Sequence, residues 1–193
     1  MPTPTLKRLI EGNRRYVSGK STVDTSEYRR TKVAFTQKPF AAILSCADSR
    51  VPPEIIFDQG LGDLFVVRTA GVILDKAVLG SLEFGLSELR TSVLLVLGHS
   101  RCGAVKYAME AGEGIRNADA DTAYLVDALK PSMGKTQPND KDKWNHTTRI
   151  HIQTVVEQLK HSPFLELDVQ AGSLEIVGGW YDLDTGIVEM LPG

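Results

Sequence analysis

Two short runs of apolar residues constrain the fold of this chain more than any other feature. Residues 40–46 and 92–98 are almost wholly apolar and lack the alternation of a half-exposed strand. Such runs are typical of strands buried on both faces, as in a parallel sheet covered by helices. Both runs are followed at once by polar residues, and open α/β sheets bind their ligands at the carboxyl ends of the strands. We therefore expect the chemistry of this chain at that edge.

The remaining patterns predict an α/β protein. We expect five strands, at 40–46, 64–68, 92–98, 173–178 and 186–191. Apolar residues at helical spacing predict helices at 4–18, 75–89, 103–110, 115–131 (ended by Pro131) and 143–160, with short helices opening at Pro53 and Pro163. Residues 19–38 lack a pattern and are interpreted as irregular, and 132–142 as a loop. Strands that alternate with helices predict a mostly parallel five-stranded sheet with an antiparallel edge strand, flanked by helices.

Length and composition fit one domain. A chain of 193 residues with 42% hydrophobic and 24% charged residues can bury an ample core. We expect a single domain over 1–193, with an N-terminal helical arm (1–38) and an α/β core (39–193). A net charge of −2 gives no reason to expect nucleic-acid binding. No apolar run approaches the roughly 20 residues of a membrane span, and no signal peptide is visible, so we expect a cytoplasmic protein.

The chain has two cysteines, and each follows a predicted strand. Cys46 ends the first apolar run, while His99 and Cys102 follow the second. A disulfide or two inert buried thiols would be the ordinary interpretation, but disulfides mark small, core-poor secreted chains. Two thiols and one imidazole are zinc ligands, and three protein ligands with an open fourth position are the catalytic arrangement. We predict a zinc ion held by Cys46, His99 and Cys102.

Asp48 and Arg50 lie two and four residues after the first of these cysteines. In an extended segment, alternate side chains share a face, so both can point toward the predicted zinc ligands. A guanidinium keeps a neighbouring carboxylate ionised through charge-assisted hydrogen bonds. The pair is either structural or, beside a metal-bound water, an acceptor that orients hydroxide.

Two hydrolase interpretations also arise from these residues. The stretch Gly98-His-Ser-Arg-Cys102 nearly matches the G-x-S-x-G nucleophile elbow, with Ser100 as the nucleophile, but Cys102 replaces its last glycine. A serine hydrolase therefore remains an alternative. A tyrosine-phosphatase loop needs a longer glycine-rich cradle than the segment from Cys46 to Arg50 provides.

A third class, a structural zinc or redox-switch protein, predicts a closed site in which Asp48 is always a metal ligand. The other histidines are His146, His151 and His161, in or beside the predicted helix 143–160. We interpret all three as surface or packed residues and not as metal ligands.

Three motifs together resemble the β-class carbonic anhydrases. They are Cys46-Ala-Asp-Ser-Arg50, Phe65-Val-Val-Arg-Thr-Ala-Gly71 and Gly98-His-Ser-Arg-Cys-Gly103. The match runs from about residue 37 to residue 108, and the order of elements agrees over nearly the whole chain. The resemblance implies reversible hydration of carbon dioxide to bicarbonate and a proton by a zinc-bound hydroxide. It also implies that the dyad of Asp48 and Arg50 orients this hydroxide, and that Asp48 becomes the fourth zinc ligand in a closed form.

The resemblance implies substrate contacts as well. Gln37 and the backbone N–H of Gly103 match donors to the substrate, and Phe65 matches an apolar pocket residue. Phe84 stands where plant-type enzymes have a tyrosine contributed across the dimer interface. The family further implies a homodimer or homotetramer in which the N-terminal helix embraces a partner. The same ligands also serve an alternative, a zinc hydrolase of the same fold that acts on carbon disulfide or carbonyl sulfide.

Overall fold

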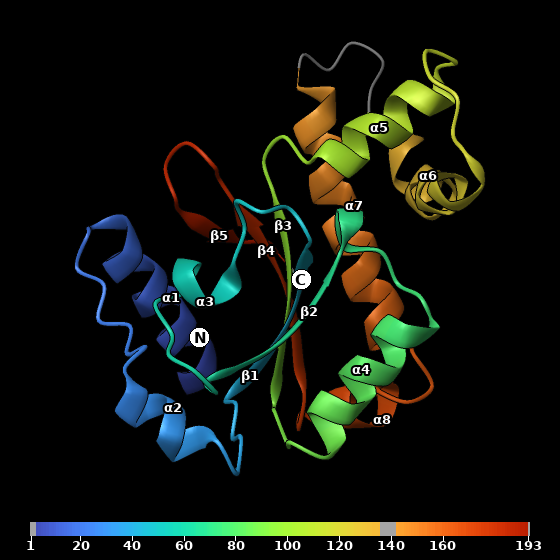
Figure 1. Cartoon of the computed structure of the whole chain (residues 1–193). Coiled ribbons are helices and arrows are strands. Elements are labelled where there is room, and N and C mark those ends of the chain that lie inside the picture. The colour runs from blue at the N-terminus through green and yellow to red at the C-terminus, as the bar shows by residue number, and fades with distance from the viewer. Residues whose placement is uncertain (1–2, 136–141, 193) are drawn as a thin grey trace.

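The computed structural model describes residues 3–135 and 142–192. Its centre is a five-stranded sheet with the order β2-β1-β3-β4-β5 (Figure 1). The first four strands are parallel and β5 is antiparallel to β4, which confirms the predicted fold class. The strands are β1 (Ala41–Cys46), β2 (Leu64–Thr69), β3 (Val93–His99), β4 (Glu175–Tyr181) and β5 (Val188–Met190).

Helices lie on both sides of the sheet (Figure 1). The N-terminal part of the chain supplies one side, with α1 (Pro4–Val17), α2 (Glu27–Val33) and α3 (Pro53–Ile56). The other side carries the 3₁₀ turn η1 (Ala70–Val72), α4 (Lys76–Ser87), α5 (Gly103–Gly112), α6 (Ala120–Met133), α7 (Lys143–Lys160) and α8 (Glu166–Gln170). Every described helix is too short or too polar to cross a membrane.

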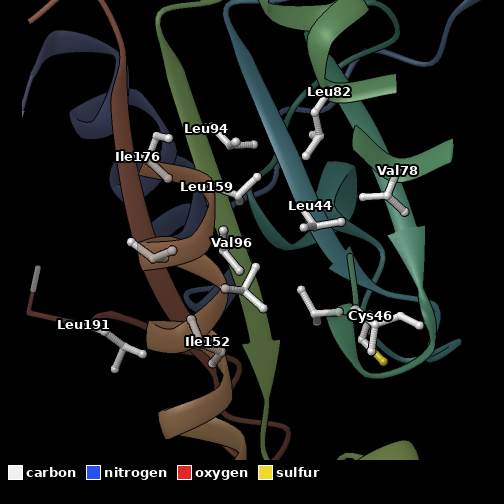
Figure 2. Packing of buried hydrophobic residues seen from close by; sticks show 14 of the residues in the cluster. Leu44, Cys46, Val78, Leu82, Leu94, Val96, Ile152, Leu159, Ile176 and Leu191 are labelled. Carbon is white, nitrogen blue, oxygen red and sulfur yellow. The ribbon is translucent and has the colours of Figure 1, made fainter. Parts of the chain in front are cut away.

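Strand β1 is buried on both faces, as its sequence predicts, because alternate side chains enter different core clusters. Leu44 packs with Ile152 and Leu159 of α7, and Figure 2 shows this cluster with Cys46 at its lower end. Ile43 points to the opposite face and joins the cluster that contains Leu9 of α1. Burial on both faces holds the strand rigidly, so the residues that follow it have a defined position.

Three expectations about the helices were wrong. Residues 19–38 contain α2, which has no buried residue and therefore no apolar pattern to detect; Ser26 caps it by accepting from the Arg29 N–H. Helix α6 starts at Ala120 and continues through Pro131 to Met133, because a proline this close to a helix end removes only one backbone bond. The helix expected to open at Pro163 begins at Glu166. Of the expected loop 132–142, residues 136–141 lie outside the described part.

Candidate metal centre

Cys46, His99 and Cys102 meet at the carboxyl edge of the sheet. Strands β1 and β3 are parallel neighbours with Ser45 opposite Leu97, so their last residues lie side by side. Cys102 follows His99 after a two-residue loop and precedes α5. All three side chains are buried, and their ligand atoms lie within 4.8 Å of one another. The structure thus brings together the three residues that the sequence predicted as metal ligands.

The two cysteine sulfurs are spaced for a metal ion and not for a disulfide. The Sγ atoms of Cys46 and Cys102 are 3.9 Å apart, whereas a disulfide requires about 2.05 Å. Two sulfurs at about 2.3 Å from one tetrahedral ion would lie about 3.8 Å apart. The hydrogen bond with Cys102 lowers the pKa of Cys46 to about 4. The same bond, together with burial, raises the pKa of Cys102. A thiolate is therefore favoured at Cys46, and the thiolate is the form of cysteine that binds a metal ion.

His99 presents one ring nitrogen to the same point. Its Nδ1 lies 2.9 Å from the Ser100 carbonyl oxygen, and because a carbonyl only accepts, Nδ1 carries the hydrogen. Nε2 therefore keeps its lone pair, yet it is buried without a hydrogen-bond partner. An unpartnered buried acceptor is costly, and a backbone bond that fixes the tautomer is typical of metal-bound histidine. The donor set and this nitrogen fit zinc.

Asp48 and Arg50 form the predicted ion pair beside the cluster. Arg50 donates from Nε to Oδ1 at 3.0 Å and from Nη2 to Oδ2 at 2.8 Å. These bonds lower the pKa of Asp48 to about 2, although partial burial acts in the opposite direction. Asp48 Oδ2 lies 3.8 Å from His99 Nε2. With both oxygens engaged by Arg50, Asp48 does not have the position that a closed structural zinc site predicts.

Arg68 supports this loop in a way that the sequence analysis missed. From the end of β2 it donates to the carbonyl oxygens of Cys46 at 3.0 Å and of Asp48 at 2.6 Å. These bonds fix the backbone that carries the first ligand and the carboxylate. The available signal was the position of Arg68 at the end of a predicted strand, which the register places opposite Ser45.

The four predicted substrate contacts separate into two groups. Gly103 begins α5 directly after Cys102 and lies at the ligand cluster. Phe65 pairs with Ala42, four positions before Cys46, which is about 13 Å at 3.3 Å per residue. Phe84 lies beside Phe65, with the two ring centroids 6.1 Å apart. Gln37 is exposed and precedes β1, so it lies at the end of that strand opposite to Cys46. Within one chain, Gln37, Phe65 and Phe84 do not reach the ligand cluster.

Ser100 is not placed as a nucleophile. Its hydroxyl is buried and accepts the N–H of Leu183 at 2.9 Å. The neighbouring His99 ring contacts the Ser100 carbonyl and not its hydroxyl, so this geometry gives no support to a serine hydrolase. Among the other histidines, His151 is buried against Ser132 and His161 is exposed, as packed and surface residues would be.

The fold and the site define an α/β protein with two cysteines and one histidine converging at the carboxyl edge of a parallel sheet. Residues 41–188 match the family model described as carbonic anhydrase. The chain is also 40% identical to carbonic anhydrase 2 of Mycobacterium tuberculosis, over 96% of this chain and 90% of that protein. It therefore belongs to the carbonic anhydrase family, in the β class.

Solved structures agree with this assignment. The β-carbonic anhydrase of Coccomyxa, in complex with acetazolamide, has a TM-score of 0.78 and 26% identity, covering 98% of this chain and 87% of that one. A structure from a study of two tetrameric β-carbonic anhydrases of Sordaria macrospora has a TM-score of 0.76 and 21% identity, covering 99% and 98%. The second comparison supports the fold alone.

Proposed function

We propose that this chain catalyses the reversible hydration of carbon dioxide to bicarbonate and a proton, with zinc held by Cys46, His99 and Cys102. The observation that carries the proposal is the buried, unpartnered Nε2 of His99, which faces two sulfurs beside an ionised carboxylate. When bound, zinc lowers the pKa of a coordinated water to about 7 and so supplies a nucleophile near neutrality. The two free cysteines fit a reducing compartment such as the cytoplasm.

Asp48 and Arg50 have distinct roles in this proposal. An ionised carboxylate only accepts hydrogen bonds, so Asp48 orients the attacking oxygen by accepting its hydrogen, which leaves a lone pair directed at the carbon of carbon dioxide. Arg50 keeps Asp48 ionised and fixes both of its oxygens. Arg68 holds the backbone beneath this pair. In the closed form, Asp48 would leave Arg50 and become a fourth ligand.

We further propose that the enzyme works as a homodimer or homotetramer, with the substrate pocket completed across a subunit interface. Gly103 offers its N–H from the same chain as the ligands. Gln37, Phe65 and Phe84 lie away from the ligands of their own chain, and Phe84 is about half exposed. These three residues are therefore available to line the pocket of a second copy, where apolar rings suit an uncharged substrate.

The decisive experiment measures metal content together with stopped-flow carbon dioxide hydration across pH. We expect about one zinc per wild-type chain, as one three-ligand site requires. Cys46→Ser should lose zinc and hydration together. Asp48→Asn should keep zinc but lose roughly 10²-fold in turnover, the low end for loss of an acid–base group.

Chelation provides the control for this experiment. Removal of zinc by a chelator should abolish hydration, and added zinc should restore it. Activity that survives in metal-free Cys46→Ser would refute the proposal. The same assay with carbon disulfide and carbonyl sulfide tests the alternative hydrolase.

A further inference from the structure

The loop that carries Cys102 is held from one side by the first turn of α7. Trp144 donates from Nε1 to the Cys102 carbonyl oxygen at 2.7 Å, and the Arg101 N–H donates to Asn145 Oδ1 at 2.8 Å. The partners are far apart in sequence, with separations of 42 positions for Trp144 and Cys102 and 44 for Asn145 and Arg101. Two consecutive residues of α7 thus bind backbone groups of two consecutive loop residues, the N–H of Arg101 and the carbonyl of Cys102.

The hairpin between β4 and β5 holds the same loop from a second side. The Ser100 N–H donates to the Tyr181 carbonyl oxygen, and the Ser100 hydroxyl accepts the Leu183 N–H, both at 2.9 Å. Arg101 forms a bidentate ion pair with Asp184, at 2.6 and 2.7 Å. The loop between His99 and Cys102 is therefore held through both its backbone and its side chains.

The backbone of Arg101 has a conformation that a residue other than glycine rarely adopts, which indicates that these contacts hold it there. Its φ of 55° lies in the left-handed region, which is uncommon for residues other than glycine and persists only where the surroundings impose it. Cys102, next in the chain, is the N-cap residue of α5, and its side chain makes no capping bond. The Cys102 Cα, from which the sulfur extends to within 3.9 Å of the Cys46 sulfur, is therefore positioned by the backbone that Trp144 and Asn145 hold.

We infer that Trp144 and Asn145 are positioning residues for the metal centre, which set where the Cys102 sulfur lies relative to Cys46 and His99. The inference rests on the proposed zinc function and deepens it. Neither side chain touches the reacting atoms; both act through the backbone of the ligand loop. Groups that orient metal ligands from outside typically change metal affinity by 10- to 100-fold when removed.

The first test needs no metal. In metal-free protein, the Arg101 amide should exchange its hydrogen at least about tenfold faster in Asn145→Ala than in wild type, because its acceptor is lost and 1.4 kcal/mol corresponds to that factor. NMR-detected exchange measures this residue directly. An unchanged Arg101 rate would overturn the inference, whether or not the chain binds zinc.

The second test measures zinc affinity by chelator competition and the absorption spectrum of the cobalt-substituted protein. Trp144→Phe keeps a ring in place but loses the N–H, and should weaken zinc binding roughly 10- to 100-fold and alter the cobalt bands. Asn145→Ala should act in the same direction. The control is Thr154→Val, which removes a hydroxyl bond to Ile150 within α7, far along the helix from the loop.

The outcomes separate the two proposals. Wild-type zinc affinity and wild-type cobalt bands in both Trp144→Phe and Asn145→Ala would overturn the positioning role and leave the proposed function intact. A wild-type chain that binds no zinc would overturn the proposed function, and faster Arg101 exchange in Asn145→Ala would then show only that Asn145 holds the loop of Cys102. Because a general loss of stability would also weaken metal binding, Thr154→Val must keep its affinity for the inference to stand.

Discussion

At the scale of the residue, His151 combines burial with a titratable ring that the proposed chemistry does not use. It is 4% exposed, and its Nδ1 lies 3.1 Å from the Ser132 hydroxyl. Burial lowers the pKa of His151 to about 4, although the carbonyls of Gly71 and Val72 act in the opposite direction. The ring therefore stays neutral in the folded chain at pH values where the unfolded chain binds a proton.

This shift predicts an acid-sensitive stability. Between the ordinary pKa of 6.5 and the folded value of about 4, only the unfolded state takes up the proton, so the free energy of unfolding falls as the pH falls through this window. The full loss is about 3 kcal/mol at 1.36 kcal/mol per pKa unit. Urea denaturation of wild type and His151→Leu between pH 7 and pH 4 should show a smaller slope in the variant.

The comparison of variants isolates this histidine, because the metal ligands are common to both proteins. His161→Gln provides the control, since the His161 side chain is 71% exposed and the variant should keep the wild-type slope. Equal slopes in wild type and His151→Leu would contradict the prediction.

At the scale of the element, α1 packs on its own chain with its backbone close to the backbone of Phe57. A Cβ added at Gly12 would lie 1.8 Å from the Phe57 carbonyl oxygen, after the end of α3. Leu6 and Leu9 of the same helix are buried. The buried face of α1 therefore packs against its own chain, in the cluster that contains Ile43 and Phe57.

Two glycines in helices make a matched pair for testing this docking. Gly12→Ala should lower the free energy of unfolding by roughly 1–3 kcal/mol, since overpacking forces backbone shifts. Gly80→Ala, in α4, meets nothing within 4 Å and should raise it by about 0.5–1 kcal/mol, the intrinsic helix preference of alanine. Chemical denaturation of both variants checks the pair. A Gly12→Ala protein as stable as wild type would mean that α1 does not seat against Phe57.

The burial of each element explains whether the sequence could predict it. Strands β1 and β3 are almost wholly apolar because both of their faces are covered, so their sequences identify them. Helix α2 buries no residue and is held instead by polar contacts, such as the bonds from Arg29 to the Leu61 carbonyl oxygen and to Asp63. Such contacts join distant segments and leave no periodic signal.

At the scale of the whole molecule, β2 is an edge strand of the sheet. Its residues are only half-buried along most of their length, and Phe84 beside it is 49% exposed. An exposed edge with apolar side chains is a template for pairing with another chain, and large exposed apolar patches mark interaction sites. This face is therefore the one that we expect in the proposed oligomer.

Sedimentation tests this expectation. The wild-type protein should sediment as a multiple of 21.1 kDa, and Phe84→Asp should shift it toward the monomer, because a charge buried in an apolar interface is costly. Leu167→Asp is the control, an exposed leucine on α8, a helix that contacts α7. A monomeric wild-type protein would refute the oligomer, and equal shifts in both variants would refute its location.

The sequence by itself determined the parallel sheet, because strands covered on both faces need apolar side chains throughout. It also pointed to the three candidate metal ligands, since Cys46, His99 and Cys102 lie at or just after the ends of those strands. Only the tertiary structure decided what holds the ligands in place. Arg68, Trp144 and Asn145 act through backbone groups of residues distant in sequence, and hydrogen bonds to a backbone carbonyl or N–H place no requirement on the type of the partner residue. Such contacts are therefore visible only once the chain is folded.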